Sequence, residues 1–151
     1  MMPSTAIVTL KEINRENLDD ILSLKVSSKQ EKFIASNAVS IAQAHFYPEV
    51  AWFRAIYADE TPVGFVMLAD NPVDSTCDLW RLMIDEGFQK RGFGRCAMKL
   101  ILQHLKTRPQ AKISTSCVCG NGSPKEFYKK IGFIDTGDID EDGELIMIYK
   151  L

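Results

Sequence analysis

The chain has 151 residues, of which 46% are hydrophobic and 25% are charged, and its formal net charge is −2. This length and balance predict a single globular domain over residues 1–151. The slight negative charge argues against a nucleic-acid-binding protein, since that class is usually basic. We also expect no membrane partner and a cytoplasmic location, because no apolar run approaches the roughly 20 residues of a membrane span and the N-terminus lacks a signal-peptide pattern.

The first quarter of the chain predicts a strand followed by two helices. Residues 6–13 alternate as in a β-strand, and Asn14 can cap a helix whose apolar residues recur at helical spacing. These apolar residues are Leu18, Ile21, Leu22 and Val26. Residues 33–44 indicate a second helix with small residues on one side, which Pro48 ends.

Three strands are predicted next. Residues 52–58 and 63–69 are rich in β-formers and are joined by a turn over residues 59–62, which indicates a hairpin. After a turn at Asn71-Pro72, a third strand follows over residues 78–85. The chain also has four cysteines, but no second Cys or His pair near Cys117 and Cys119 completes a zinc pattern. We therefore expect no metal and reduced cysteines that pack in the interior, namely Cys77, Cys96, Cys117 and Cys119.

A segment with two glycines, Gln89-Lys90-Arg91-Gly92-Phe93-Gly94-Arg95, joins the third of these strands to a long amphipathic helix that Arg108-Pro109 closes. Glycines one residue apart permit positive φ and a close approach to a ligand, so the N–H groups at the helix start can converge on an anion such as a pyrophosphate. The third glycine of the dinucleotide fingerprint and the Gly-Lys-Ser/Thr ending of a P-loop are both missing. An ordinary strand-to-helix turn is the alternative interpretation.

A second segment, residues 121–133, predicts a short helix near the C-terminus. Ser123 and Glu126 form a capping box, Pro124 suits the first helical position, and Gly132 is a stop signal. Phe127 and Ile131 form the apolar stripe of this helix, and Tyr128 lies beside the stripe with its hydroxyl free to face a cleft. A strand over residues 113–119 precedes the helix, and strands over 134–136 and 145–149 follow it around an acidic turn at 138–143.

The two segments resemble the hallmarks of the GCN5-related N-acetyltransferase (GNAT) family. They match its Gln-x-x-Gly-x-Gly loop after a strand and its Asn followed by a short helix ending in Tyr-x-x-x-Gly-Phe. The predicted order β-α-α-β-β-β-α-β-α-β-β is also that of the family. The resemblance implies an α/β fold, with a mixed, mostly antiparallel sheet splayed between its fourth and fifth strands and flanked by helices.

By resemblance, the chain uses acetyl-CoA. The backbone of Met83 and Ile84 would bond the pantetheine amides, the N–H groups from Gln89 to Arg95 would hold the pyrophosphate, and Asn121 would fix the pantetheine arm from the other side. The implied cofactor-binding residues are Met83, Ile84, Gln89, Lys90, Arg91, Gly92, Phe93, Gly94, Arg95, Asn121, Ser123 and Lys129. Lysines and arginines flank both segments, which gives the phosphates the positive potential they need.

The implied reaction is a direct transfer in a ternary complex, in which the Tyr128 hydroxyl donates a proton to the departing thiolate. The acceptor amine, with an ordinary pKa of about 10.4, must first lose a proton. Glu31, Glu49 and Asp78 are the carboxylates considered for this step, and the sequence does not choose among them. His45 and His104 are expected to be boundary or core residues. No cysteine is well placed to form an acetyl-enzyme, although Cys119 lies close to the expected cleft.

Several runs of the chain look like those of small bacterial spermine/spermidine N-acetyltransferases, and an acidic protein suits a polycationic amine. The expected substrate-binding residues are Glu31, Asp78, Ser36 and Asn37. Other amines, such as an aminoglycoside, an amino acid or a protein N-terminus, remain alternatives. A catalytically silent CoA-binding regulatory module and a nucleotide-binding domain are further alternatives. Relatives are often dimers, so the resemblance leaves a homodimer open.

Overall fold

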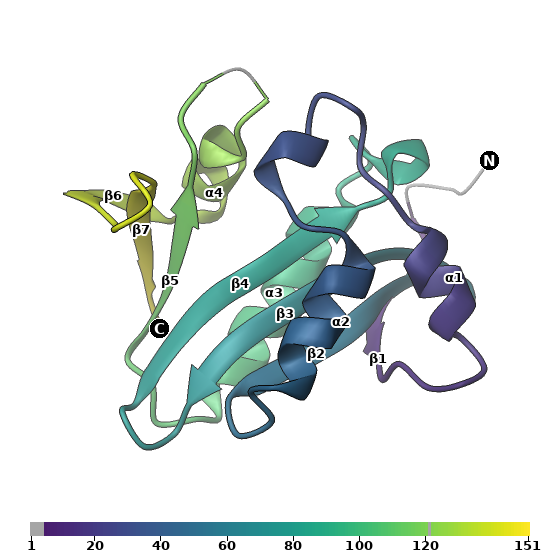
Figure 1. The fold of residues 1–151 in the computed structure, drawn as a ribbon, viewed down its shortest axis with the longest axis horizontal. Helices are drawn as coiled ribbons and strands as arrows, with labels where there is room; N and C mark the ends of the chain where they lie inside the picture. The colour runs from purple at the N-terminus through teal and green to yellow at the C-terminus, as the bar shows by residue number, and fades with distance from the viewer. Residues whose placement is uncertain (1–4, 121) are drawn as a thin grey trace.

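The β-branched and aromatic runs of the sequence form one seven-stranded sheet with the order β1-β2-β3-β4-β5-β7-β6 in the computed structural model, which describes residues 5–120 and 122–151 (Figure 1). The strands are β1 (Val8–Lys11), β2 (Ala51–Ala58), β3 (Thr61–Asn71), β4 (Thr76–Ile84), β5 (Lys112–Cys117), β6 (Ile134–Ile139) and β7 (Leu145–Lys150). The helices are α1 (Leu18–Ser23), α2 (Asn37–His45), α3 (Phe93–Lys106) and α4 (Lys125–Ile131), with 3₁₀ turns η1 (Glu31–Phe33) and η2 (Glu86–Phe88). This is the α/β fold with a mixed sheet that the sequence predicted.

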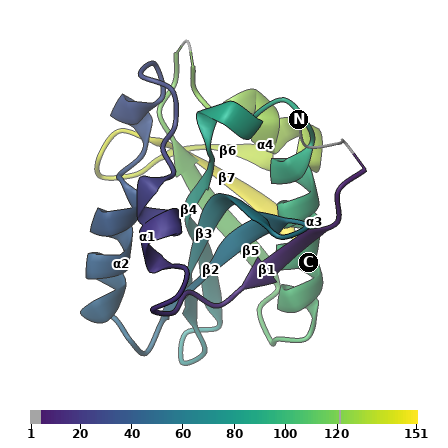
Figure 2. The same cartoon turned by 90° about the vertical axis from the view of Figure 1, so that its right-hand side faces the viewer.

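Helices cover both faces of the sheet. Figure 2 shows α1 and α2 on one side of it and α3 and α4 on the other. Because side chains alternate along a strand, β3 supplies both cores: Val66 and Leu68 pack with α3, whereas Phe65 and Met67 pack beneath α1 and α2. A central strand that is buried on both faces needs apolar residues at consecutive positions, which explains the apolar run Val-Gly-Phe-Val-Met-Leu-Ala in β3.

The sheet opens between β4 and β5. These neighbours are parallel and share a single register pair, Asp78 with Ser114, whereas every other pair of adjacent strands is antiparallel. In β4 the register against β3 slips by one residue, since Met67 lies opposite Arg81 and Leu68 opposite Leu79. Trp80 is therefore the extra residue of a β-bulge, which bends and twists β4 where it leaves β5. The predicted splay between the fourth and fifth strands is confirmed.

The two predicted N-terminal helices are shorter than expected. Asn14 does not cap α1 with its side chain: its Oδ1 accepts the N–H groups of Glu16 and Asn17, which forms a turn before the helix. The helix ends at Ser23, so Val26 lies outside it and lines a cleft instead. The predicted helix over 33–44 is divided into η1 and α2, because the Ser36 Oγ accepts the Val39 N–H and begins a new helix.

Smaller corrections concern the hairpin and the cysteines. Only Asp59 and Glu60 form the turn between β2 and β3, since Thr61 already begins β3. All four cysteines are free, and Cys77 and Cys117 are buried as expected. The expectation of interior packing is wrong for the other two, Cys96 and Cys119, which are exposed, and β5 ends before Cys119.

Within residues 5–120 and 122–151, no helix combines the length and the hydropathy that crossing a membrane requires.

Gly64 tests how tightly β3 fits against the end of β4. A Cβ at this position would overlap the carbonyl oxygen of Met83, and backbone cannot move aside as a flexible side chain can. We expect Gly64→Ala to lower the free energy of unfolding by about 1–3 kcal/mol, measured by urea unfolding. Gly87→Ala is the control, because the nearest atom to its added Cβ is a side-chain oxygen of Asp85 at 3.2 Å. Equal unfolding midpoints for Gly64→Ala and the parent chain would contradict this packing.

Candidate active site

A cleft of about 1110 Å³ follows the gap between β4 and β5. One wall is β4 from Asp78 to Ile84, and the opposite wall is β5 from Thr115 to Cys117 together with Tyr128 of α4. The segment before α2 and the turn between β6 and β7 also contribute residues. Because β4 beyond Asp78 has no partner strand on its β5 side, backbone groups there are available to an extended ligand.

The glycine segment lies at the open end of this gap, where α3 begins. Gly92 is the residue before the helix and has a φ of +84°, and a Cβ added there would meet nothing within 4 Å. The first N–H groups of a helix lack intrahelical partners and carry the positive end of the helix dipole, so the 14-residue α3 offers Phe93, Gly94 and Arg95 N–H groups to an anion. The Phe93 side chain is buried in the core, so only its backbone is available.

Gly94 has a different role from the one predicted. It lies inside α3 without a positive φ, so the expectation of two glycines curling the loop is wrong for this position. A Cβ on Gly94 would approach Phe127 to 3.2 Å and Ile84 to 3.6 Å. Its small size lets the start of α3 pack against α4 and the end of β4. Besides Gly92, the loop residue with a positive φ is Lys90, at 64°.

The polar and basic residues of the loop are placed unequally. The Gln89 side chain lines the cleft and donates to the Ile84 carbonyl at 2.8 Å. Lys90 and Arg95 are exposed, and Arg91 donates to the Gly87 carbonyl at 3.3 Å with its guanidinium over the Phe88 ring. In α4, Lys129 is paired with Glu126 at 3.9 Å and does not line the cleft. Asn121 lies outside the described residues.

The α4 helix begins one residue later than its sequence signals indicate. Pro124 is the residue before the helix, and the Ser123 Oγ accepts the N–H of Lys125 at 3.2 Å, so the predicted capping box between Ser123 and Glu126 is not formed. Gly132 ends the helix at a φ of +125°, as predicted. A Pro at this position still stops the helix from extending backwards, because its ring fixes φ and has no N–H.

Tyr128 lines the cleft with a side chain that is largely buried. Its side chain is 6% exposed and packs between Phe127 and Phe133 at centroid distances of 5.5 and 5.4 Å. Burial raises the pKa of Tyr128 to about 12, although a hydrogen bond with Thr115 opposes the shift. Thr115 lies on β5 and its Oγ1 is 3.5 Å from the Leu79 carbonyl of β4. The phenol therefore keeps its proton through the physiological pH range.

The expected substrate residues fall in two places. Asp78 lines the main cleft, and burial raises its pKa while Lys112 opposes the shift. Glu31, Ser36 and Asn37 instead line a smaller pocket of about 270 Å³ beneath the segment before α2. Ser36 caps α2, and the buried Asn37 amide donates to the Ile21 carbonyl at 2.9 Å, so both side chains have structural partners.

Neither histidine takes part in the cleft. His104 is a boundary residue that stacks on Trp52 at a centroid distance of 4.7 Å, and burial lowers its pKa. His45 is exposed beside Phe46. Glu49 is also exposed and lines neither pocket. The expectation of a core or boundary residue is confirmed for His104 and is wrong for His45, which is exposed.

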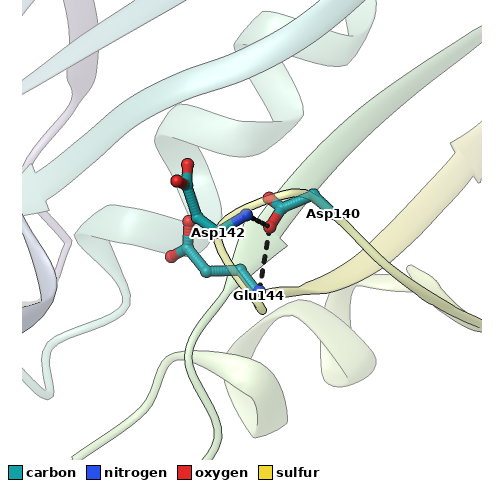
Figure 3. Close-up of side chains that lie close together, drawn as sticks. All are labelled: Asp140, Asp142 and Glu144. Carbon is teal, nitrogen blue, oxygen red and sulfur yellow. Dashed lines mark hydrogen bonds between the residues drawn. The ribbon is translucent and has the colours of Figure 1, made fainter.

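Sequence reasoning missed the acidic turn between β6 and β7 as part of the site. Asp140, Glu141, Asp142 and Glu144 all line the cleft. The Asp140 carboxylate accepts the N–H groups of Asp142 and Glu144 at 2.9 Å each, so the turn is held by one of its own side chains (Figure 3). Carboxylate oxygens of Asp140, Asp142 and Glu144 lie within 4.8 Å of one another. Acidic residues at alternate positions of a short turn were the signal available in the sequence.

The turn has a high density of negative charge. Burial raises the pKa of Glu144, and the neighbouring Asp140 and Asp142 carboxylates raise it further, whereas Arg81 opposes them. The pKa of Asp140 is lowered by the hydrogen bond from the Glu144 backbone. Such a group favours a cationic ligand, because a positive charge relieves the repulsion among the three carboxylates.

Comparisons with known proteins agree with this geometry. The sequence model of the acetyltransferase (GNAT) family matches residues 17–133. The spermine/spermidine N(1)-acetyltransferase of Bacillus subtilis (strain 168) is 30% identical over 154 residues, which cover 95% of this chain and 99% of that relative. The crystal structure of spermidine N-acetyltransferase from Vibrio cholerae in complex with CoA and spermine superposes with a TM-score of 0.73 at 18% identity and covers 95% of both chains.

Two further relatives have other names. The peptidyl-lysine N-acetyltransferase YjaB of Salmonella typhimurium is 29% identical over 108 residues, 70% of this chain and 67% of that one. The PaiA N-acetyltransferase from Thermoplasma acidophilum, solved with coenzyme A, has a TM-score of 0.72 at 16% identity and covers 96% of this chain and 99% of that chain. The chain belongs to the acetyltransferase (GNAT) family, and it is an N-acetyltransferase that uses acetyl-CoA.

Gly92→Val tests the loop at the start of α3. We expect acetyl-CoA affinity to fall at least about tenfold in calorimetry, because a β-branched side chain disfavours the positive φ and covers the N–H groups at the start of α3. Gly137→Val is the matched control, since Gly137 has a φ of +82°, also has nothing within 4 Å of an added Cβ, and lies in β6. A folded Gly92→Val protein with unchanged affinity would remove the anion-cradle assignment.

Tyr128→Phe tests the hydroxyl while keeping the ring. We expect kcat to fall roughly 10²-fold or more with little change in acetyl-CoA affinity, as for a general acid. Because the pKa of Tyr128 is about 12, the parent enzyme should show no rate loss from tyrosine deprotonation below about pH 10. A pH–rate series on both proteins checks this, and parental turnover by the variant between pH 6 and 9 would reduce Tyr128 to a packing residue.

Proposed function

We propose that this N-acetyltransferase acetylates a polyamine of the spermine or spermidine type by direct transfer within a ternary complex. The observation that carries the proposal is the charge of the cleft next to Tyr128. Five carboxylates line it, those of Asp78, Asp140, Glu141, Asp142 and Glu144, against two basic side chains, Lys32 and Arg81. The name of the 30% identical relative points to the same substrate class.

A polyamine suits such a wall for electrostatic reasons. Its ammonium groups are spaced along an apolar chain, so one amine can react while the others remain charged and are held by carboxylates. An ordinary monoamine would gain nothing from the additional carboxylates. The excess of negative charge in the cleft therefore selects for acceptors with more than one positive charge.

The cleft also fits acetyl-CoA, whose thioester supplies the acetyl group. We propose that the backbone of Met83 and Ile84, on the unpaired edge of β4, bonds the pantetheine amides, and that the N–H groups of residues 93–95 at the start of α3 hold the pyrophosphate. Lys90 and Arg95 add positive potential as exposed, flexible side chains. Asn121 and Ser123 keep the acetyl-CoA-binding role that the family resemblance implies.

Two residues of the cleft are suited to move protons. Tyr128 holds a proton that it can donate to the leaving thiolate, because burial keeps the phenol neutral. Asp78 lies where β4 and β5 diverge, and its raised pKa makes it a better proton acceptor than an ordinary aspartate. We propose that Asp78, directly or through water, takes the proton that the reacting amine must lose.

The distal ammonium groups are assigned to the β6–β7 turn. Asp142 and Glu144 line the main cleft, whereas Glu31 lines the adjoining small pocket and is retained as a contact for the far end of a long polyamine. Ser36 and Asn37 support this pocket through α2 rather than through free polar groups. The two pockets share Val26, Ile34, Ala35 and Met83 in their walls, so a flexible chain can extend from one to the other.

Arg81 favours a second candidate, an acceptor amine that also carries a carboxylate. Its guanidinium lines the cleft and donates to Gln43 at 3.0 Å, while its buried Nε has no hydrogen-bond partner among the described residues. Amino acids and protein N-terminal segments have such groups. The polyamine proposal ranks higher because, once Glu144 is taken as the counter-charge of Arg81, four carboxylates still face a single basic side chain, that of Lys32.

A CoA-release screen against a panel of amines distinguishes these candidates. The panel contains spermine, spermidine, butylamine, lysine and a short peptide with a free N-terminus. We expect spermine and spermidine to give the highest kcat/KM, with an advantage over butylamine that shrinks as salt rises, since salt screens the distal charges. Equal rates for butylamine and spermine at all salt concentrations would refute the polyamine proposal.

Single carboxylate replacements provide the residue-level prediction. Asp142→Asn and Glu144→Gln should each raise KM for spermine by roughly threefold to thirtyfold, the range between an exposed ion pair and a partly desolvated one. KM for butylamine should change much less. Glu49→Gln is the control, because Glu49 is an exposed carboxylate that lines neither pocket.

Asp78→Asn should behave differently from the turn variants. As the proposed proton acceptor, it should lower kcat for every amine rather than raise KM for spermine alone. Steady-state kinetics with spermine and butylamine separate the two patterns. A parental kcat in Asp78→Asn would refute the proton-acceptor role. An unchanged KM for spermine in both turn variants would refute the ammonium site.

A further inference from the structure

The segment between α1 and α2, residues 24–36, joins the two walls of the cleft at its open end (Figure 1). On the β4 side, the Lys25 N–H donates to the Asp85 carboxylate at 3.0 Å, and the Lys25 carbonyl accepts the Glu86 N–H at 2.9 Å. On the β5 side, the Phe33 ring lies so close to Gly122 that an added Cβ would be 3.2 Å from it. The segment is thus held at both edges of the gap.

One side chain connects this segment to the loop that precedes α3. The Gln89 amide nitrogen donates to the Ile84 carbonyl and to the Gln30 Oε1, each at 2.8 Å. The Gln30 Oε1 also accepts the Ser27 N–H at 3.3 Å. Both amide hydrogens of Gln89 are therefore used. Because the Gln30 side chain accepts one of them and also accepts the Ser27 N–H, it links Gln89 to the backbone of its own segment.

We infer that Gln30 is a positioning residue that couples acetyl-CoA binding at the glycine loop to the ordering of residues 27–33 on the acceptor side of the cleft. The inference rests on the proposed assignment of that loop to acetyl-CoA. An anion at the start of α3 fixes the backbone that carries Gln89, and Gln89 can then hold Gln30 in one position. Acetyl-CoA binding would then further stabilise the acceptor-side wall, which includes Phe33, Ile34 and Ala35.

The direction of the hydrogen bonds makes the inference testable with conservative changes. Gln30 acts only as an acceptor in both contacts, so Gln30→Glu keeps the acceptor oxygen, whereas Gln30→Leu removes it at similar size. Gln103→Leu applies the same substitution to an exposed position of α3 outside the cleft and is the matched control.

Hydrogen–deuterium exchange with and without coenzyme A provides the readout, because it needs no acceptor amine and no turnover. In the parent protein and in Gln103→Leu, saturating coenzyme A should slow exchange both in peptides over 89–95 and, by roughly fivefold or more, in peptides over 27–33. In Gln30→Leu the protection of 89–95 should remain while that of 27–33 is lost. Gln30→Glu should restore it.

The outcomes separate this inference from the proposed function. Protection of 89–95 without protection of 27–33 in the parent protein, or equal protection of 27–33 in Gln30→Leu, would overturn the role of Gln30. Protection of neither segment by coenzyme A would overturn the loop assignment as well. Failure of spermine in the amine screen would leave the exchange result intact, because the probe is coenzyme A alone.

Discussion

The site depends on one constraint: β4 and β5 are neighbours in the sheet but share only the pair Asp78–Ser114. A fully paired strand would consume the backbone hydrogen-bonding groups of β4 and close the gap. The bulge at Trp80 prevents this, because one extra residue bends β4 away from β5 just beyond their single pair. The result is an unpaired strand edge inside the molecule that borders a ligand-sized cleft.

The closed end of the gap is held by a buried polar network. Asp70, at the end of β3, is 6% exposed and pairs with Arg108 at 2.9 Å. Asp70 also accepts a hydrogen bond from Gln110, which precedes β5. Removing one partner of such a network leaves an uncompensated buried charge, which costs several kcal/mol. The network thus fixes where β5 begins relative to β3, and with it the point from which the two strands diverge.

Tyr128 and the β6–β7 turn, which both line the cleft, differ in charge because they differ in burial. Tyr128 is set among aromatic rings, so its phenol stays neutral and keeps a proton. The β6–β7 turn is mostly exposed and satisfies its backbone with the Asp140 carboxylate, so several negative charges can coexist there in contact with water. A neutral phenol and an anionic turn therefore line the same cleft.

Local pattern was sufficient for the elements whose stability is local or strongly periodic. The amphipathic run after Gly92 predicted α3, the turn signals predicted the β2–β3 hairpin, and the stop signal at Gly132 predicted the end of α4. The resemblance to the family added the mixed, mostly antiparallel sheet and its splay. The N-terminal helices were predicted too long, because the Ser36 side chain competes for backbone N–H groups in a way that apolar spacing does not reveal.

Other features were decided by tertiary structure. Gly94 is small because Phe127, 33 residues away in the chain, packs against it, and no local pattern contains that contact. Asn37, which the sequence placed among the substrate residues, is buried, and its amide donates to the Ile21 carbonyl. The sequence by itself determined which residues are acidic, basic or apolar and where the main helices and strands run. Only the folded chain decided that the β6–β7 turn lines the same cleft as Tyr128, since the sheet brings together segments that no spacing along the chain relates.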